Sequence, residues 1–238
     1  MKLLQYVISS ILLIVPAQAA PLWYNGDWNN STGLANGRNY MFQDAWIYED
    51  FIVPSGGWTI TGVFSNDFFF PGTLPNSVFW EIRSGVSPGS GGVLIGNGTV
   101  SATVTPTGRT LFGQSEYTVL GSGLAVPLGP GKYWLAAVPV GSGSGNNPFV
   151  SGTLGSNCVG LPCGNDGSAF YYEPGNPSFQ FYPTTNFSPD QKDYSFGVIG
   201  TAVPEPGSLI PFTLACVLCV FFGRGITADT EATTRRPL

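Results

Sequence analysis

The stretch Leu124-Ala-Val-Pro-Leu-Gly-Pro-Gly-Lys-Tyr-Trp-Leu135 decides the fold of this chain. Two apolar runs flank Pro130-Gly131, and such a pair suits a tight turn because proline fixes φ and glycine accepts a positive φ. The stretch therefore predicts a strand, a turn and an aromatic strand. The side chain of Tyr133 or Trp134 is expected to fill the core.

The rest of the central chain repeats this pattern. Glycine, proline, serine and asparagine recur at intervals of roughly 8 to 12 residues between short runs of β-branched and aromatic residues, as is typical of an all-β protein. No stretch away from the termini has a sustained helical period. The expected strands are Ala45–Val53, Trp58–Ser65, Ser77–Arg83, Val93–Ile95, Thr99–Thr105, Thr110–Leu120, Leu124–Leu128, Lys132–Val140, Ser168–Tyr172 and Tyr194–Gly200.

Two local patterns are more specific. Gly96-Asn97-Gly98 lies between two β runs and predicts a tight hairpin, because asparagine and glycine tolerate positive φ at both turn positions. In the strand that starts at Trp58, strict alternation places Trp58, Ile60 and Phe64 on one face.

The Leu124–Leu135 stretch resembles the "L-x-V-x-L-x-P-G-x-Y-x-L" corner of many secreted bacterial β-sandwiches, including fibronectin-like and jelly-roll modules. The resemblance implies an antiparallel β-sandwich of one of these two kinds. The segment from Ala20 to Ala202 has a length that suits a single domain. Because domains of unrelated function share this corner, it predicts fold and not activity.

The N-terminus has the features of a secretory signal. Lys2 supplies a positive charge, Leu3–Val15 is almost wholly apolar, and Ala17-Gln-Ala19 is a small-x-small site that a signal peptidase accepts. We predict a signal peptide over residues 1–19, with the mature chain beginning at Ala20. An uncleaved N-terminal anchor is the alternative.

The C-terminus combines a rigid motif, an apolar segment and a basic tail. Val203, Pro204, Glu205 and Pro206 form the motif, and residues 208–223 form a predicted membrane segment. This segment is shorter than the roughly 20 apolar residues of a permanent transmembrane helix, and a buried core helix is the alternative. Positive residues stay in the cytoplasm, so the domain is expected to lie outside. The tail, residues 224–238, carries Arg224, Arg235 and Arg236.

Motif, segment and tail, in this order at the end of the chain, resemble the C-terminal sorting signal of the PEP-CTERM family, carried by exported proteins of Gram-negative bacteria. The resemblance implies that an exosortase, an intramembrane transpeptidase, recognises this signal and removes it. Exosortase and export machinery are thus the expected partners. The protein would be anchored in the inner membrane in transit, then reach the outer envelope, the cell surface or the extracellular space. This chain departs from the pattern in that a polar insert separates Arg224 from Arg235 and Arg236.

Cysteine usage agrees with export. Cys158 and Cys163 are the one pair within residues 20–202, and they are expected to form a disulfide in an oxidising compartment. The alternative is a pair of metal ligands, although the chain has no histidine and no second cysteine pair in the domain to complete a tetrahedral site. We therefore assign no metal ligand.

Composition excludes several classes of function. Residues 20–202 contain five basic and eleven acidic residues, a formal charge of −6, so a nucleic-acid partner is not expected. The absence of histidine removes Ser-His-Asp and Cys-His nucleophile systems. Glycoside hydrolysis needs only two carboxylates, but no spacing pairs any of the candidates. Those candidates are Glu49, Asp50, Glu81, Glu116 and Glu173.

Aromatic clusters offer a second kind of site. Exposed tryptophan and tyrosine rings can stack on sugars, but aromatic side chains also fill sandwich cores. Three consecutive phenylalanines cannot all point inward from one strand, so a loop, a partner or a ligand must cover at least one. The clusters are Trp23-Tyr24 with Trp28, Phe68-Phe69-Phe70, Phe170-Tyr171-Tyr172 and Phe179-Gln-Phe181-Tyr182.

Oxygen-rich turns leave a structural Ca²⁺ as an open alternative. Asn165-Asp166-Gly167 and Asn66-Asp67 offer oxygen ligands, although neither matches the EF-hand spacing. Asn-Asp-Gly is first of all a turn sequence. No other cofactor is expected.

These patterns together predict an exported, noncatalytic, all-β protein with a removable sorting signal, residues 203–238. The family resemblance implies a place in an exopolysaccharide-rich envelope or biofilm matrix, with a structural or adhesive role and weak contacts to polysaccharide. The alternative is a dedicated carbohydrate-binding module. A glycan-active enzyme is a third hypothesis, which requires two carboxylates in one cleft.

Overall fold

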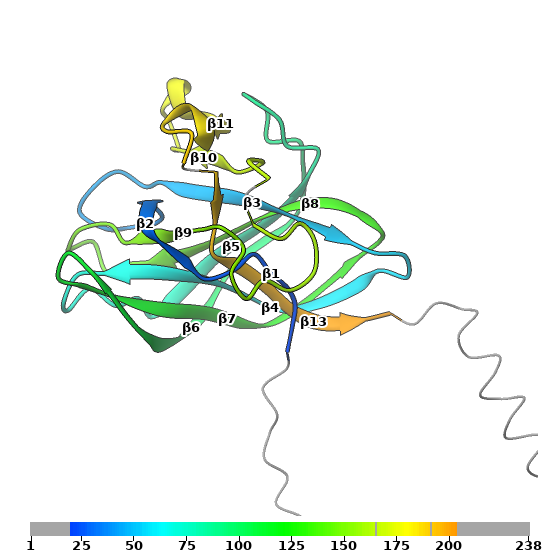
Figure 1. Cartoon of the computed structure of the whole chain (residues 1–238), viewed down its shortest axis with the longest axis horizontal. Coiled ribbons are helices and arrows are strands. Elements are labelled where there is room, and N and C mark those ends of the chain that lie inside the picture. The colour runs from blue at the N-terminus through cyan, green and yellow to red at the C-terminus, as the bar shows by residue number, and fades with distance from the viewer. Residues whose placement is uncertain (1–19, 165, 191, 204–238) are drawn as a thin grey trace, which may run out of the picture.

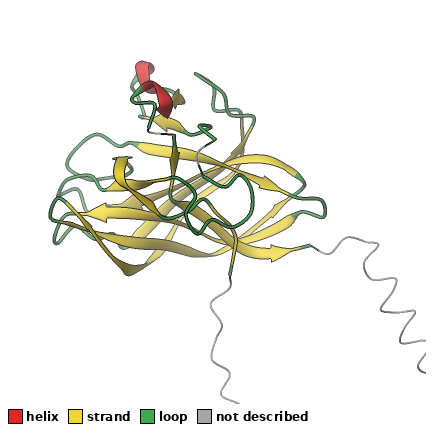
Figure 2. Ribbon diagram, viewed as in Figure 1, coloured by secondary structure: helices red, strands yellow, loops and turns green. Residues whose placement is uncertain are grey.

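In a computed structural model, the described part of the chain comprises residues 20–164, 166–190 and 192–203. It is all-β, as predicted, and consists of a curled antiparallel sheet with a sandwich-like arrangement (Figure 1, Figure 2). The predicted signal peptide, with Ala17 and Ala19, lies outside the described residues. So do the membrane segment, Pro204 to Pro206, and the arginines of the tail.

Within the described residues the hydrogen-bonded strand order is β1-β13-β4-β7-β6-β5-β8-β3-β10-β11, and β9 joins β4, β2 and β12. Two short 3-10 helices, η1 (Pro177–Phe179) and η2 (Thr184–Asn186), flank β11. The strands are β1 (Pro21–Tyr24), β2 (Trp28–Ala35), β3 (Trp46–Val53), β4 (Trp58–Phe69), β5 (Ser77–Ser84), β6 (Val93–Leu111), β7 (Gln114–Leu128), β8 (Gly131–Val140), β9 (Phe149–Thr153), β10 (Phe170–Tyr172), β11 (Tyr182–Pro183), β12 (Asp193–Tyr194) and β13 (Phe196–Ala202).

Strand β6 connects the two halves of the curled sheet. Its first part, Val93 to Ser101, pairs with β5, and its second part, Ala102 to Leu111, pairs with β7. On one side of this strand Val100, Ala102 and Val104 pack against the main core. The same strand therefore holds β5 with β8 and β3 on one side, and β7 with β4 and β13 on the other.

Two hydrophobic clusters stabilise the sheet. The main cluster lies between the two halves and contains Trp23, Phe51, Ile60 and Phe196, each fully buried. The second lies on the opposite face of β3, β5, β8 and β10, where Trp46 and Tyr48 pack with aromatic neighbours. Alternate residues of these strands thus serve different clusters, which is why most residues of β3 and β8 are buried.

The predicted hairpin at Gly96-Asn97-Gly98 is wrong, because these residues lie inside β6. The two glycines leave room for the indole ring of Trp80 on the paired strand. A Cβ atom on Gly96 would lie 3.3 Å from Trp80 Cη2, and one on Gly98 would lie 3.1 Å from Trp80 Nε1. The glycines therefore allow a large ring to lie flat against a strand, which local turn preferences do not reveal.

The prediction of a single strand over Thr110–Leu120 is also wrong. Phe112 and Gly113 form a two-residue turn between β6 and β7, with φ angles of 47° and 79°. Positive φ at both positions is characteristic of a type I′ hairpin. The sequence signal was hidden because phenylalanine is an unusual residue at the first position. Strand β13 likewise begins at Phe196, after β12 and a break at Ser195.

The Leu124–Leu135 corner connects the two halves of the sheet. β7 pairs with β4 and β6, whereas β8 pairs with β5 and β3, so the Gly129-Pro130 turn changes the pairing partners of the chain. The hydroxyl of Tyr133 donates to the carbonyl oxygen of Gly129 at 3.0 Å, and its ring packs on the main core. Trp134 points to the second cluster.

A β-bulge in β4 changes which side chains face the core. The pairing of β4 with β7 shifts register between Ile60 and Gly62. Trp58 and Ile60 face the core as predicted, but after the bulge the core residue is Val63 and not Phe64. An extra residue in a period-two strand moves every later side chain to the other face. Phe64 therefore lies on the outer face of the sheet.

Within the described residues, none of the helices has the length and apolar character that a membrane span would need.

We predict that Gly98→Val destabilises the protein by about 1–3 kcal/mol, because the added methyl groups would press against the Trp80 ring in a packed core. Asn97→Val on the same strand is the matched control, since its side chain is exposed and valine favours strands. Urea denaturation of both variants measures the effect. Equal free energies of unfolding for the two variants would contradict the conclusion that Gly98 leaves room for the Trp80 ring.

Candidate functional site

A groove of about 550 Å³ lies on the outer face of the sheet. Strands β13, β4, β7 and β6 lie side by side beneath it, and β1 forms one margin. Its walls are polar and its floor is apolar, a combination suited to a ligand with both kinds of surface. The lining residues are Ala20, Pro21, Tyr24, Asp27, Phe64, Asn66, Thr103, Thr105, Thr107, Arg109, Thr118, Leu120 and Ile199.

Hydrogen bonds fix the polar wall of the groove. The hydroxyl of Tyr24 donates to Asp27 Oδ1 at 2.7 Å and accepts from Asn66 Nδ2 at 3.0 Å. Asn66 Nδ2 also donates to Ser195 Oγ at 2.8 Å, and Asn66 Oδ1 accepts from the Thr118 hydroxyl at 2.7 Å. Burial and the bond to Asp27 raise the pKa of Tyr24, which stays protonated. The wall is thus held in place before any ligand arrives.

Charged groups at one end of the groove neutralise one another. The guanidinium of Arg109 pairs with Asp27 at 3.2 Å and with the buried carboxylate of Glu116. Glu116 also accepts hydrogen bonds from Thr107 and Ser151. Burial acts to raise the pKa of Asp27, but hydrogen bonds from Tyr24 and Asn157 and the Arg109 charge lower it overall. Asp27 therefore stays ionised and is not suited to donate a proton.

The floor of the groove depends on the bulge in β4. Phe64, Leu120 and Ile199 point outward from β4, β7 and β13. The Phe64 ring lies over Gly197, where a Cβ atom would come within 2.3 Å of it. It also packs against Tyr24, with ring centroids 5.5 Å apart. An aromatic and aliphatic floor beneath hydroxyl groups matches the two-sided chemistry of a sugar ring.

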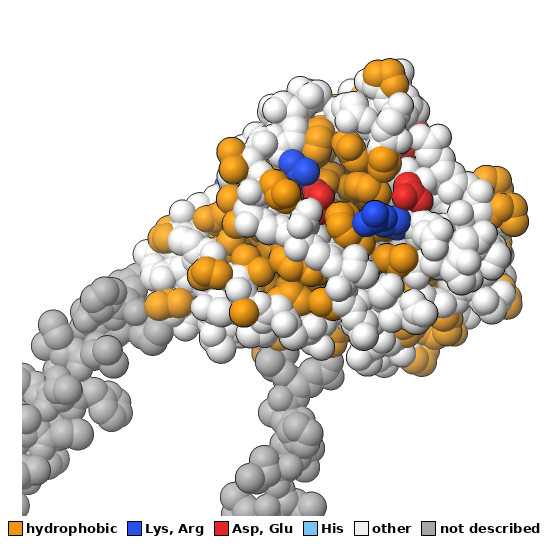
Figure 3. Space-filling model, turned by 180° about the vertical axis from the view of Figure 1, so that it is seen from behind, with side chains coloured by type: hydrophobic (Ala, Val, Ile, Leu, Met, Phe, Trp, Pro, Cys, Tyr) orange, Lys and Arg blue, Asp and Glu red, His pale blue; other side chains and the backbone are white. Residues whose placement is uncertain are grey.

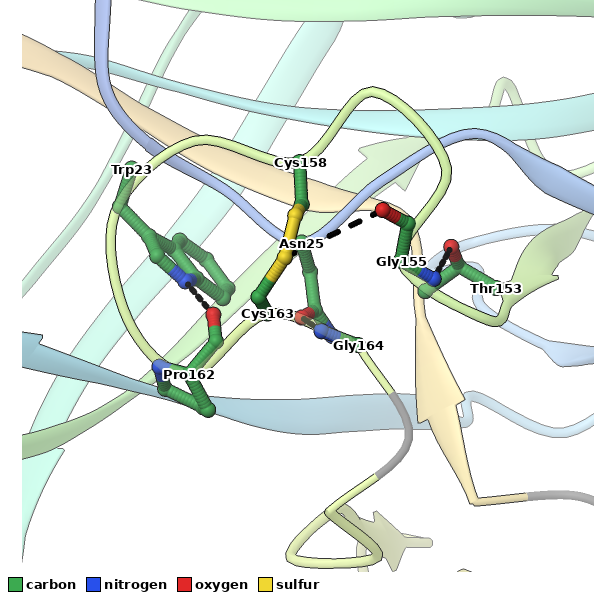
Figure 4. The surroundings of a disulfide bond; sticks show 8 residues. All are labelled: Trp23, Asn25, Thr153, Gly155, Cys158, Pro162, Cys163 and Gly164. Carbon is green, nitrogen blue, oxygen red and sulfur yellow. Dashed lines mark hydrogen bonds between the residues drawn. A yellow bond between two sulfur atoms is a disulfide. The ribbon is translucent and has the colours of Figure 1, made fainter.

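A disulfide loop fixes the margin of the groove at β1. The structure joins Cys158 and Cys163, as the sequence predicts, with Cα atoms 5.6 Å apart. Figure 4 shows this loop beside β1, where Trp23 Nε1 donates to the Pro162 carbonyl at 3.0 Å. The amide of Gly164 donates to Asn25 Oδ1 at 2.7 Å. These bonds position the strand that carries Tyr24.

Half of the aromatic residues proposed as a sugar platform are buried. Trp23, Phe68 and Phe69 are inaccessible to solvent, and Phe170, Tyr171 and Phe181 are nearly so. Phe69 faces the main core, whereas Phe68 points the other way and packs edge-on against Trp28 of β2. These rings therefore fill the interior, and Tyr24 is the member of the predicted clusters that lines the groove.

The second cluster forms an aromatic face with two arginines. Trp46 lies 5.5 Å from Phe79 and 5.2 Å from Tyr172 between ring centroids. Arg38 stacks on Phe79 at 4.6 Å, and Arg83 lies 5.7 Å from the Tyr48 ring. Seen from behind, the molecule shows a broad hydrophobic area with basic and acidic side chains among it (Figure 3). This face is packed by its own side chains, which cover most of each ring.

The five candidate carboxylates of a glycosidase do not line the groove. Glu49 and Asp50 lie on opposite faces of β3, where Glu49 accepts from the Tyr194 amide and Asp50 pairs with Lys132 at 2.9 Å. Glu81 accepts from Tyr48 at 2.5 Å. Glu116 pairs with Arg109, and Glu173 accepts from Tyr171 and Asn176. The lining carboxylate is instead Asp27, which sequence analysis did not select.

The two sites suggested for Ca²⁺ differ in what the structure reveals. Asn66 faces the groove, while Asp67 points inward and accepts from Asn36 and Ser65, so the two side chains do not converge. Asn165 lies outside the described residues, and its neighbour Asp166 lies 4.0 Å from Lys132. Among the described residues no three acidic or cysteine side chains are arranged to hold a metal ion.

Sequence reasoning missed the groove because its residues are ordinary polar and apolar types. Alternation in Thr103, Thr105 and Thr107 was the available signal, since every second residue of a strand shares a face. The bulge that turns Phe64 and Asn66 outward has no comparable signature.

Comparisons with protein-family models, with curated proteins and with solved structures found no match to this chain.

We predict that Arg109→Ala destabilises the protein by about 3 kcal/mol at pH 8, because it leaves the buried Glu116 carboxylate without its cation. Arg38→Ala is the control, since Arg38 is about half exposed and lies 4.0 Å from Asp44; its loss should cost less than about 1 kcal/mol. Chemical denaturation of both variants gives the comparison. A loss for Arg109→Ala no larger than for Arg38→Ala would contradict the role of the pair.

The raised pKa values of the buried acidic side chains predict that their contribution to the free energy of unfolding falls as the pH rises. Burial raises the pKa of Asp50 to about 6 and the pKa values of Asp67 and Asp193 to about 7. Burial, and then the charges of Asp193 and Asp50, raise the pKa of Glu49 well above its usual value. The folded state therefore holds protons that the unfolded chain releases near pH 4. The contribution of these buried acids to stability is fully present below about pH 4 and is lost as the pH rises through the raised values of about 6 to 7.

Glu49→Gln tests this dependence. Glutamine keeps the acceptor for the Tyr194 amide and carries no charge, so the free energy of unfolding should rise at pH 8 and change little at pH 5. Asp44→Asn, at the partly exposed ion pair with Arg38, is the matched control for replacing a carboxylate by its amide outside the interior. Thermal unfolding between these pH values measures both. A pH profile of Glu49→Gln as steep as that of the wild type would refute the conclusion that the folded state keeps Glu49 protonated.

Proposed function

We propose that this protein is an exported, noncatalytic component of the cell surface or extracellular matrix, with a structural or adhesive role in an exopolysaccharide-rich envelope. The observation that carries the proposal is the groove. Its polar wall and its charges are already paired, and hydroxyl groups and an apolar floor are left to face a ligand. Such a surface suits a ligand that binds through hydrogen bonds and apolar contacts.

Two further features support this function. The all-β domain with its disulfide suits an oxidising compartment. The resemblance of the C-terminal sequence to a PEP-CTERM sorting signal supports export, with exosortase as the processing partner. Val203, the first residue of that motif, is half exposed and follows directly on β13, so the motif would begin where the domain ends. We further propose that the sandwich-like fold is of the jelly-roll or fibronectin-like kind.

A dedicated carbohydrate-binding module is the second candidate, and Tyr24 with Phe64 in the groove favours it. Half of the rings proposed for a planar platform are buried, which favours weak contacts over a deep sugar site. A glycan-active enzyme finds less support, since Asp27 is the carboxylate among the groove's lining residues.

Intact mass spectrometry of the protein from its native producer, combined with cell fractionation, tests the proposal. We expect a chain that begins at Ala20, ends near residues 203–207 and occurs in the outer envelope or the medium. A chain that retains residues 209–238 in the inner membrane would instead indicate a plain anchor and would remove the main support for a matrix protein.

A further inference from the structure

The outer side of β6 carries a row of exposed hydroxyl groups. Thr99, Ser101, Thr103 and Thr105 alternate with residues that face the core, and all four are exposed. No register shift interrupts the pairing of β6 over these residues. At about 3.3 Å per residue the row spans roughly 20 Å, with a hydroxyl group every 6.6 Å or so.

This row connects two hollows. Thr99 lines a shallow hollow of about 470 Å³ together with Arg38, Asn39, Asp44 and Val140. Thr103 and Thr105 line the groove beside β1 at the other end. The two hollows are therefore ends of one surface, and Ser101 lies between them on the same strand.

An aromatic ring lies beside the row at each end: Phe79 is buried beneath Arg38, and Phe64 is partly exposed in the groove. Thr99 pairs with Phe79 across β5 and β6, so their side chains share a face, and Arg38 stacks on that ring. Thr103 pairs with Leu120, which in turn pairs with Phe64. Thr105 likewise pairs with Thr118 on β7, which in turn pairs with Asn66 on β4. At these paired positions, hydroxyl or amide groups thus lie next to an apolar surface.

Charge at the two ends is internally balanced. Arg38 lies 4.0 Å from Asp44 in the shallow hollow, and Arg109 pairs with Asp27 and Glu116 beside the groove. Neither end offers an unpaired charge of a kind that would select an acidic or basic ligand. Hydroxyl groups in a row, the partly exposed Phe64 ring at one end and paired charges fit a neutral chain of sugars.

We propose that an extended, neutral polysaccharide binds along β6, from the shallow hollow at Thr99 to the groove at Thr105. This inference rests on the proposed adhesive function and adds the ligand class and the path of its chain. The site recognises a run of several sugar units, and no single unit is held tightly. Affinity consequently grows with the length of the chain until both ends are occupied.

The test is calorimetric titration of the full protein with linear β-1,4-glucan oligosaccharides of increasing length. We expect affinity to rise with length and then level off. The double variant Thr103→Val and Thr105→Val removes two hydroxyl groups while keeping shape and strand preference, and it should bind the longest oligosaccharide about tenfold more weakly. Thr110→Val on the same strand, outside the groove lining, is the matched control and should bind as the wild type does.

The outcomes separate this inference from the proposed function. An affinity that changes neither with the length of the oligosaccharide nor in the double variant would overturn the binding path along β6. The adhesive role would then belong to another part of the surface. Stronger binding of a polyuronate than of the neutral glucan would overturn the neutral ligand. Concentration-dependent self-association that the double variant abolishes, seen by light scattering without glucan binding, would assign this face to a second copy of the chain. Processing and location of the protein remain a separate measurement.

Discussion

Strand β6 is the constraint on which the rest of the structure depends, because it is hydrogen-bonded to both halves of the curled sheet. A strand that serves two partners must present an apolar face along its whole inner side and a polar face along its outer side. Val100, Ala102 and Val104 meet the first requirement. The outer residues are then free to differ, and they are the ones that connect the two hollows.

The domain also buries several acidic side chains, with few cations to pair with them. Glu49, Asp67 and Glu116 are inaccessible to solvent, yet Arg109 is the cation that meets a buried acid of this group. Asp67 relies on Asn36 and Ser65, and Glu49 on a single backbone amide. Buried carboxylates supported by neutral donors favour the protonated form, which links folding to pH. The groove is built in the opposite way, with its charges paired, and its shape is therefore less sensitive to protons.

The sequence predicted the all-β class and most of the strands because their apolar periodicity is local. β3, β5 and β8 lie within a residue of their expected bounds. The errors came where a non-local contact decides. Gly96 and Gly98 look like a turn until the Trp80 ring is placed upon them, and Phe112 hides a turn because it adopts a positive φ. Short strands such as β1 and β9 have no period of their own and form only against their neighbours.

The candidate site was harder to predict than the fold. The bulge near Gly62 reverses the direction of every later side chain in β4, so the expected core residue Phe64 becomes part of the groove floor. Tyr24 was singled out for its ring, but its position depends on a disulfide loop that begins at Cys158. The carboxylates chosen by residue type proved to be structural, and Asp27 gained its place from the turn after β1.

The position of β13 has a mechanical consequence. This last strand lies between β1 and β4, is antiparallel to both, and ends at Ala202. A pull on Val203 along the strand would load both ladders in shear, so that many hydrogen bonds must break together. A ligand held on β6 would share that load through β7 and β4, which lie between it and β13. The last strand is thus placed so that its hydrogen bonds to β1 and β4 resist such a pull as a group.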